Sequence, residues 1–216
     1  MNQVEGEFMQ IQRFVLGMFL TNCYVVSGNC PGKCIVIDPA DDADRILAYM
    51  NNKKVMPEVI LLTHGHYDHF LAVPDLQKIW PSLPVYCHPK DCPVAKEEYD
   101  YDMGRTYPTV SAFHNVKSIV EQDRIKEAGF DILVLETPGH TKGSVTFLLE
   151  DAMFTGDTLF AGSIGRTDFA GGDERQMAAS LRRLAGITKD YNVYPGHESI
   201  TTLKKEKQYN PYLKFL

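Results

Sequence analysis

The chain of 216 residues is 44% hydrophobic and 23% charged, and its 22 basic and 28 acidic residues give a formal net charge of −6. This apolar content argues against a disordered chain, and the missing basic stripe argues against nucleic-acid binding, which requires clustered Lys and Arg. No apolar run reaches the roughly 18 residues of a membrane span, and no signal peptide is recognised. We therefore expect one soluble, cytoplasmic domain over residues 1–216 that binds neither nucleic acid nor membrane. Five cysteines, an odd number without a Cys-x-x-Cys pair, fit reduced thiols.

The first part of the chain predicts strands with helices between them. β-Branched and aromatic runs separated by glycine turns predict strands, and apolar residues at helical spacing predict helices. Residues 59–62 are continuously apolar, which is typical of a strand buried on both faces of its sheet. Helices are predicted over 41–51 and from residue 68 or 69 to 79, where Pro81 ends the second one. The predicted strands are residues 10–16, 22–27, 33–37, 59–62 and 85–87.

The second half repeats this texture without repeating the sequence. Asp173 is predicted to cap a helix that reaches about Leu184, and a last helix covers 200–209. Residues 156–172 form a glycine-rich loop. Strands that precede helices in two similar halves predict a mixed α/β (α+β) chain in which two sheets pack together. The predicted strands of this half are residues 132–136, 144–149, 152–155 and 191–194.

The segment of residues 89–115 is the least regular part of the chain. Its prolines, acidic residues and aromatic side chains indicate a long loop or a lid rather than core. A surface excursion without a role in substrate choice is the alternative. The aromatic residues concerned are Tyr99, Tyr101, Tyr107 and Phe113.

A dense group of potential metal ligands follows the apolar run 59–62. In an extended segment His64, His66 and Asp68 project to one side, because side chains alternate along the backbone. His69 can join them from the first turn of the next helix. Imidazole nitrogens and carboxylates are ligands that zinc and similar ions prefer. Residues 64–69 therefore predict a metal site, and solvated loop histidines are the alternative.

Three more residues recur in one sequence context. His140, Asp157 and His197 each follow a predicted strand and a glycine that permits a sharp turn. Each alone would be an ordinary loop residue. Together with the 64–69 cluster they include five of the seven histidines, however, so we expect these residues to complete the metal site. His88 and His114 fall outside the pattern and are expected to be surface or capped histidines.

Taken in order, Asp38, the 64–69 cluster, His140, Asp157 and His197 resemble the five motifs of the metallo-β-lactamase superfamily. Within it, the chain is most similar to the small hydrolases of the glyoxalase II (hydroxyacylglutathione hydrolase) group. The resemblance covers most of the chain. It implies a four-layer αββα sandwich, with two metal ions at one edge of the two sheets.

The resemblance also implies a role for each residue. Two divalent cations, zinc first with iron or manganese as alternatives, would turn a bridging water into hydroxide. Asp68 and Asp157 would act in catalysis through that hydroxide, which attacks a small thioester such as an S-acyl-glutathione. Asp38 would orient a ligand histidine through a hydrogen bond. The implied ligands are His64, His66 and His140 for the first ion, Asp68, His69 and His197 for the second, and Asp157 as a bridge between them.

Departures from the family pattern concern the substrate. We expect the chain to lack the C-terminal helical domain with which glyoxalase II grips glutathione, and Ser199 stands where that family has a tyrosine. Arg166 occupies the place of a family lysine, and it is expected either to clamp a substrate carboxylate or to pair with Asp168. Lys142 is a weaker substrate-binding candidate and is expected to be solvated.

Other functions remain open at this point. Residues 165–169 are also similar to persulfide dioxygenases of the same superfamily, in which one iron on His64, His140 and Asp157 would use O₂. A metal-stabilised binding domain without catalysis is a third interpretation, but no ligand is missing to favour it. β-Lactam hydrolysis is not expected, because those enzymes are exported. Metal stoichiometry separates the first two functions, while the acyl group, the thiol carrier and the oligomeric state stay open.

Overall fold

Two mixed β-sheets form the centre of the molecule. The computed structural model describes residues 9–92 and 113–214. In spatial order, the strands of the first sheet are β1 (Gln10–Leu16), β2 (Thr21–Ser27), β3 (Lys33–Ile37), β4 (Met56–Leu61), β5 (Val85–Cys87) and β6 (Val116–Ser118). Those of the second sheet are β14 (Thr201–Thr202), β13 (Asn192–Pro195), β10 (Ala152–Gly156), β9 (Val145–Leu149), β8 (Phe130–Glu136) and β7 (Arg124–Glu127). A separate two-stranded ribbon consists of β11 (Leu159–Phe160) and β12 (Ser163–Ile164).

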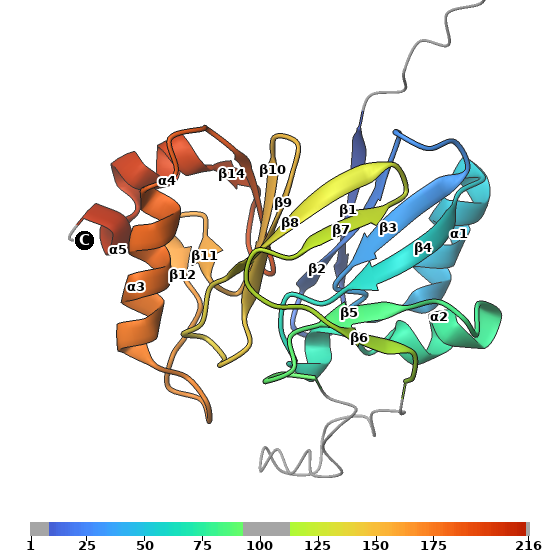
Figure 1. The fold of residues 1–216 in the computed structure, drawn as a ribbon, viewed down its shortest axis with the longest axis horizontal. Helices are drawn as coiled ribbons and strands as arrows, with labels where there is room; N and C mark the ends of the chain where they lie inside the picture. The colour runs from blue at the N-terminus through green and yellow to red at the C-terminus, as the bar shows by residue number, and fades with distance from the viewer. Residues whose placement is uncertain (1–8, 93–112, 215–216) are drawn as a thin grey trace, which may run out of the picture.

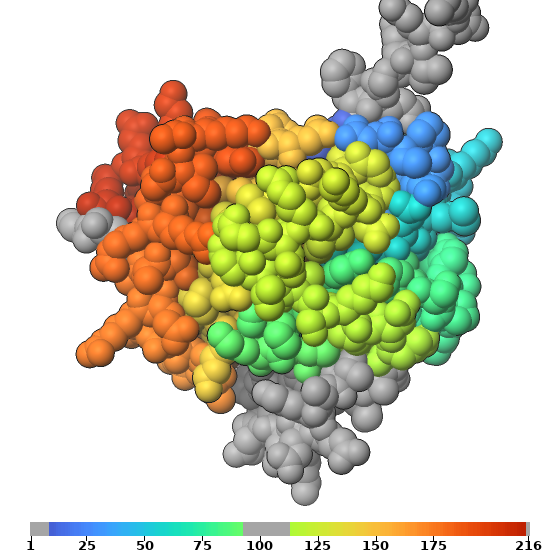
Figure 2. All heavy atoms as spheres, in the orientation of Figure 1, coloured from blue at the N-terminus to red at the C-terminus, as the bar shows by residue number. Residues whose placement is uncertain are grey.

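Helices cover the outer face of each sheet. The helices on the first sheet are α1 (Ala43–Lys53) and α2 (Val73–Ile79), and those on the second are α3 (Glu174–Ala185), α4 (Leu203–Tyr209) and α5 (Pro211–Lys214) (Figure 1). In Figure 2, blue and cyan N-terminal residues form one flank of the molecule and orange and red C-terminal residues form the other. Within the described residues, no helix has the length and apolarity needed to cross a membrane.

Three apolar cores separate four layers. One lies between α1, α2 and the first sheet, one between the two sheets, and one between the second sheet and α3 to α5. Val59 and Leu61 of β4 belong to the core between the sheets, whereas Ile60 and Leu62 belong to the core under the helices. All four side chains are fully buried. This confirms both the strand buried on two faces and the expected αββα sandwich of the α/β class.

The helix predicted to start at residue 68 or 69 begins later. Tyr67–His69 form one 3₁₀ turn, η1, and α2 starts only at Val73. Between them, the backbone amide of Leu71 donates to the carbonyl oxygen of Ala40 at 3.1 Å. A contact with the loop after β3 therefore replaces the helical hydrogen bond that the periodicity predicts.

Several short elements were not predicted. The ribbon β11–β12 lies inside the stretch 156–172 that was expected to be loop, and the helix predicted over 200–209 is β14 followed by α4. Strands β6 and β7 are also additional. Strands this short contain too few side chains to show an apolar period.

The expectation for Phe113 is wrong. Its side chain is 4% exposed and lies in the core under α2, with its ring centroid 5.4 Å from that of Phe70. Tyr99, Tyr101 and Tyr107 lie outside the described residues, as does most of the expected lid. Phe113, near the C-terminal end of this segment, therefore belongs to the core.

The carboxyl ends of several strands meet at one edge of the two sheets. Strands β3 and β4 run parallel, as do β10 and β13, and β8 runs in the direction of β10 because both are antiparallel to β9. The amide of Val145 donates to the carbonyl of Thr63 at 2.8 Å, and Asn22 Nδ2 donates to the carbonyl of Pro195 at 2.8 Å. These bonds join the sheets at this edge, so the loops that leave the strands lie side by side.

Candidate metal centre

The predicted ligands converge at this edge. Two follow β4, two lie in η1, and one follows each of β8, β10 and β13. Groups whose ligand atoms lie within 4.8 Å of one another are His64, His66 and His140; His64, His69 and Asp157; and Asp68, His69 and His197. The first and last groups are the two sets that the resemblance implies, and the middle group connects them.

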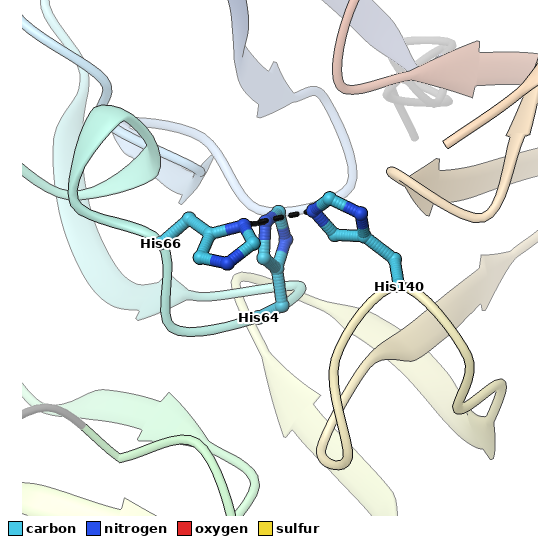
Figure 3. A group of neighbouring side chains, drawn as sticks. All are labelled: His64, His66 and His140. Atoms are coloured by element: carbon cyan, nitrogen blue, oxygen red, sulfur yellow. Dashed lines mark hydrogen bonds between the residues drawn. The ribbon is translucent and has the colours of Figure 1, made fainter. Parts of the chain in front are cut away.

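Three imidazole rings of the first group point toward one another (Figure 3). His66 Nδ1 lies 3.0 Å from His64 Nε2 and 2.8 Å from His140 Nε2. A ring nitrogen offers either one hydrogen or one lone pair in the ring plane, so it cannot make two hydrogen bonds at once. Three nitrogens aimed at a common point are the arrangement that a metal ion requires.

Backbone carbonyl groups determine which ring nitrogen of His140 and of His197 faces the centre. His140 Nδ1 donates to the carbonyl oxygen of Arg166 at 2.7 Å, and His197 Nδ1 donates to that of Phe19 at 3.2 Å. A carbonyl oxygen only accepts, so Nδ1 carries the hydrogen in both rings. Nε2 is thereby left as the atom available to a metal ion.

The second group has the spacing of ligands around an ion rather than that of hydrogen bonds. Asp68 Oδ2 lies 3.6 Å from His69 Nε2 and 3.5 Å from His197 Nε2. Two ligands at about 2.1 Å from one tetrahedral ion are about 3.4 Å apart, whereas a hydrogen bond between charged groups is about 2.7–2.9 Å. The observed distances therefore fit a shared cation.

Asp157 faces both groups. Its Oδ2 lies 3.4 Å from His140 Nε2 and 3.4 Å from His197 Nε2, and its Oδ1 lies 3.5 Å from His69 Nε2. Within the described residues, His69 Nε2 and Asp157 Oδ1 are buried without a hydrogen-bond partner. Buried polar atoms are rarely left in this state, and a cation between the two groups would satisfy both.

Asp38 orients two histidines through hydrogen bonds, one directly and one through Thr63. One of its carboxylate oxygens accepts from His69 Nδ1 at 3.0 Å and from Thr63 Oγ1 at 2.7 Å. Because that hydroxyl hydrogen is committed to Asp38, Thr63 Oγ1 accepts from His64 Nδ1 at 3.1 Å. The carboxylate is 2% exposed, and its backbone φ of 47° lies in the left-handed region. One buried carboxylate therefore orients a ring in each group.

Sequence reasoning missed two hydroxyl groups of the site. Thr63 relays the contact of Asp38, and Thr21 Oγ1 donates to Asp68 Oδ2 at 2.7 Å. Threonine at the end of a strand is common, so neither residue stands out in the sequence. Only the position of Thr63 directly before the 64–69 cluster could have drawn attention to it.

Burial keeps two histidines of the first group neutral. It lowers the pKa of His66 to about 4, with the neighbouring His140 as the next cause. It also lowers the pKa of His64 well below its usual range, and the charge of His69 adds to this shift. Neutral imidazoles can bind a metal ion without first losing a proton.

Two histidines of the second group are cationic in the metal-free protein. Burial lowers the pKa of His69, but the facing carboxylates of Asp68, Asp157 and Asp38 outweigh it and raise that pKa to about 9. Asp157 and Asp68 likewise overcome burial and raise the pKa of His197 to about 10. The same contacts lower the pKa of Asp68 to about 2 against the effect of burial. Asp68 therefore remains ionised at neutral pH.

Gly196 leaves room for the centre. A Cβ at this position would lie 2.2 Å from Asp157 Oδ1 and 2.8 Å from His69 Cε1. Its amide donates to the carbonyl of Gly156 at 2.8 Å, and its carbonyl accepts from the amide of Asn22 at 2.7 Å. Close packing against the candidate ligands Asp157 and His69 therefore requires a glycine before His197.

The substrate-binding candidates lie beside the centre. Arg166 forms a bidentate pair with Asp168, at 2.7 and 2.6 Å, and its guanidinium stacks 3.7 Å above the ring centroid of Phe169. The intramolecular pair, one of the two expectations for this arginine, is present. Lys142 is exposed in the loop after His140.

The remaining histidines and the cysteines lie outside the three groups. His88 is buried rather than on the surface, and its Nε2 lies 3.0 Å from Glu136 Oε1. His114 Nε2 donates to the carbonyl of Pro81 at 2.7 Å. All five cysteines are free thiols, as expected.

Residues 16–197 match the family model described as Metallo-beta-lactamase superfamily. The chain belongs to the metallo-beta-lactamase superfamily. Hydroxyacylglutathione hydrolase GloC of Haemophilus influenzae is 32% identical over 95% of this chain and 98% of its own length. The similarity between this metallo-hydrolase and GloC therefore extends over nearly the full length of both chains.

Solved structures give the same placement. BLEG-1 B3 metallo-beta-lactamase superposes with a TM-score of 0.82 at 31% identity, over 94% of this chain and 99% of the other. TTHA1623 in a di-iron-bound form has a TM-score of 0.81 at 36% identity, over 94% and 100%. ETHE1 from Myxococcus xanthus has a TM-score of 0.75 at 27% identity, over 94% and 83%. The fold is therefore that of the superfamily, whose members bind divalent metals. The three structures have different names, so the fold alone does not identify a substrate.

Proposed function

We propose that this metallo-hydrolase holds two divalent cations, zinc in the first place with iron or manganese as alternatives. The donor set of imidazole nitrogens and carboxylates suits all three metals, so availability would decide among them. The proposed ligands are His64, His66 and His140 for the first ion, Asp68, His69 and His197 for the second, and Asp157 for both. The distances of 3.4 to 3.6 Å from Asp68 and Asp157 to the facing histidine nitrogens support the second set and the role of Asp157. The three converging ring nitrogens support the first set.

The proposed reaction is hydrolysis of a small thioester, of which S-acyl-glutathione is the type. The observation that carries this proposal is a complete set of seven ligands together with full-length similarity to GloC. When bound, two divalent cations lower the pKa of water toward neutrality and polarise the thioester carbonyl. No Ser or Cys nucleophile is then required, which agrees with the position of all five cysteines outside the groups.

The residues of the centre supply orientation and access. The side chains of His197 and Asp68 are 23% and 16% exposed, whereas that of His69 is fully buried. His197 and Asp68 therefore mark the side from which a substrate would reach the centre. Asp38 acts as a positioning residue, because it fixes ring orientation through hydrogen bonds and does not face the approach side.

Metal analysis combined with a thioesterase assay tests the proposal. The protein is purified without added metal, its zinc, iron and manganese contents are measured, and S-lactoylglutathione hydrolysis is followed. Two equivalents of metal with thioester cleavage are expected. Glu58→Gln is a control, because Glu58 accepts from the amide of Ala128 at 2.6 Å outside the centre, and it should change neither the metal content nor the activity. Cleavage of a β-lactam with no cleavage of thioesters would contradict the proposal.

A second candidate is oxidation of a persulfide by O₂ at one iron that His64, His140 and Asp157 would hold. The similarity to ETHE1 favours it, together with the 3.4 Å contact between His140 Nε2 and Asp157 Oδ2. One equivalent of iron with oxygen uptake on glutathione persulfide would select this function over hydrolysis. Thioester cleavage by protein loaded with two equivalents would reject it.

A further inference from the structure

Asp91 lies where the two loops of the first histidine group meet. Its Oδ2 accepts from the amide of Gly65 at 3.3 Å and from the hydroxyl of Thr141. Its Oδ1 accepts from the amide of Gly143 at 2.9 Å. Gly65 stands between His64 and His66, and Thr141 follows His140. One carboxylate thus binds both loops that supply this group.

Asp91 packs closely against a glycine of each loop. A Cβ on Gly65 would lie 2.0 Å from the carbonyl oxygen of Asp91, and a Cβ on Gly143 would lie 2.7 Å from its Cγ. Both loops therefore use glycine where they pass this residue. The glycine between the two histidines, in particular, is needed for the approach of Asp91.

The turn that carries Asp91 is itself anchored. Its amide donates to the carbonyl of His88 at 2.9 Å, and the amide of Lys90 donates to His88 Nδ1 at 3.2 Å. The hydrogen of that imidazole is therefore on Nε2, which donates to Glu136 at the end of β8 at 3.0 Å. The buried His88 thus ties the turn of Asp91 to the strand that precedes His140.

The second group is held in a different way. Asp68 is oriented by Thr21, His69 by Asp38 and His197 by the carbonyl of Phe19, and none of these contacts involves Asp91. A change at Asp91 should therefore act on the first group and leave the second in place.

We propose that Asp91 is a positioning residue for the first metal ion, acting through the backbone of Gly65 and the hydroxyl of Thr141. The inference rests on the proposed metal-dependent function, because it concerns the ligands His64, His66 and His140. Loss of the carboxylate would let the two loops separate. Changes to residues that orient metal ligands without binding the metal themselves typically lower metal affinity about 10- to 100-fold.

Zinc affinity is the readout, measured by competition with a chromophoric chelator on the full chain. Asp91→Asn keeps the shape but loses one acceptor, and we expect the affinity of one equivalent to fall at least about tenfold while the other stays within about twofold. Thr141→Val should weaken the same equivalent, and Thr141→Ser, which keeps the hydroxyl, should restore it. Thr21→Val should instead weaken the other equivalent, and Glu58→Gln should weaken neither.

The outcomes separate this inference from the proposed function. Wild-type affinity for both equivalents in Asp91→Asn and Thr141→Val would overturn the inference, as would equal weakening of both. Missing thioesterase activity in the wild type would reject the proposed substrate and leave the affinity differences as the test. If the wild type binds one iron on His64, His140 and Asp157, Asp91→Asn must still weaken that ion, because both loops are involved.

Discussion

Metal binding to the metal-free protein should release at least about two protons at pH 7, because His69 and His197 each lose one. With a pKa of about 9 for His69 and about 10 for His197, both are protonated at neutral pH in roughly 99% of molecules or more. His66, with a pKa of about 4, is protonated in roughly 0.1%, and His64 has its pKa lowered further in the same direction. A cation at the second group must therefore displace two protons, whereas His64 and His66 lose none.

The consequence is a steep pH dependence for one equivalent. Each displaced proton changes the apparent binding constant about tenfold per pH unit below the pKa of its group, so two protons give about 100-fold between pH 7 and 8. The carboxylates add nothing, because the pKa of Asp68 is about 2 and that of Asp157 is well below its usual range, against burial and under the charge of His69. The second group should therefore show this slope.

Isothermal titration of zinc into metal-free protein measures both quantities. Repeating the titration in buffers with different ionisation enthalpies gives the number of protons released, and repeating it between pH 6 and 8 gives the slope. Release of fewer than one proton over the complete titration at pH 7 would refute the reasoning. So would binding constants that do not change with pH for either equivalent.

Three further predictions use other parts of the structure. Gly196→Ala should lower zinc affinity at least about tenfold, because the added Cβ would lie 2.2 Å from Asp157 Oδ1 and 2.8 Å from His69 Cε1. The circular dichroism spectrum should stay unchanged. Unchanged zinc affinity would show that the added Cβ does not disturb the centre. Asp157→Ala should remove most bound metal and reduce turnover by several orders of magnitude, whereas retention of both ions at full rate would disprove the bridge. Arg183 lowers the pKa of Glu121 to about 2. The stabilisation by this pair is therefore present above the unfolded-state pKa of about 4.5 and is lost as pH falls toward 2, so the urea midpoints of wild type and Glu121→Gln should converge over that range.

Much of the architecture follows from local sequence. The run 59–62 is apolar at every position, which is typical of a strand with a core on each face, and this predicts a layered α/β fold. His64, His66, Asp68 and His69 are so closely spaced that the sequence identifies them as candidate ligands, although the fold divides them between two groups. Glycines before His140, Asp157 and His197 mark sharp turns after strands, so the far members of the centre could also be found.

What local pattern could not supply were contacts between distant segments. Helix α2 begins at Val73 rather than at residue 68 or 69, because Leu71 donates to Ala40 in another loop. Phe113 lies in a segment with the composition of a surface loop, yet it is buried against Phe70.

At the metal centre too, the candidate ligands can be recognised in the sequence, whereas the residues that orient them cannot. The candidate ligands are recognisable because metal binding demands particular residue types in a dense pattern. Thr21, Thr63 and Asp91 are ordinary residues whose importance comes only from the partners that the fold brings to them. Sequence alone therefore determined the layered fold and the candidate ligands. Tertiary structure decided how those ligands are oriented, because hydrogen bonds between segments far apart in the chain have no signature in local spacing.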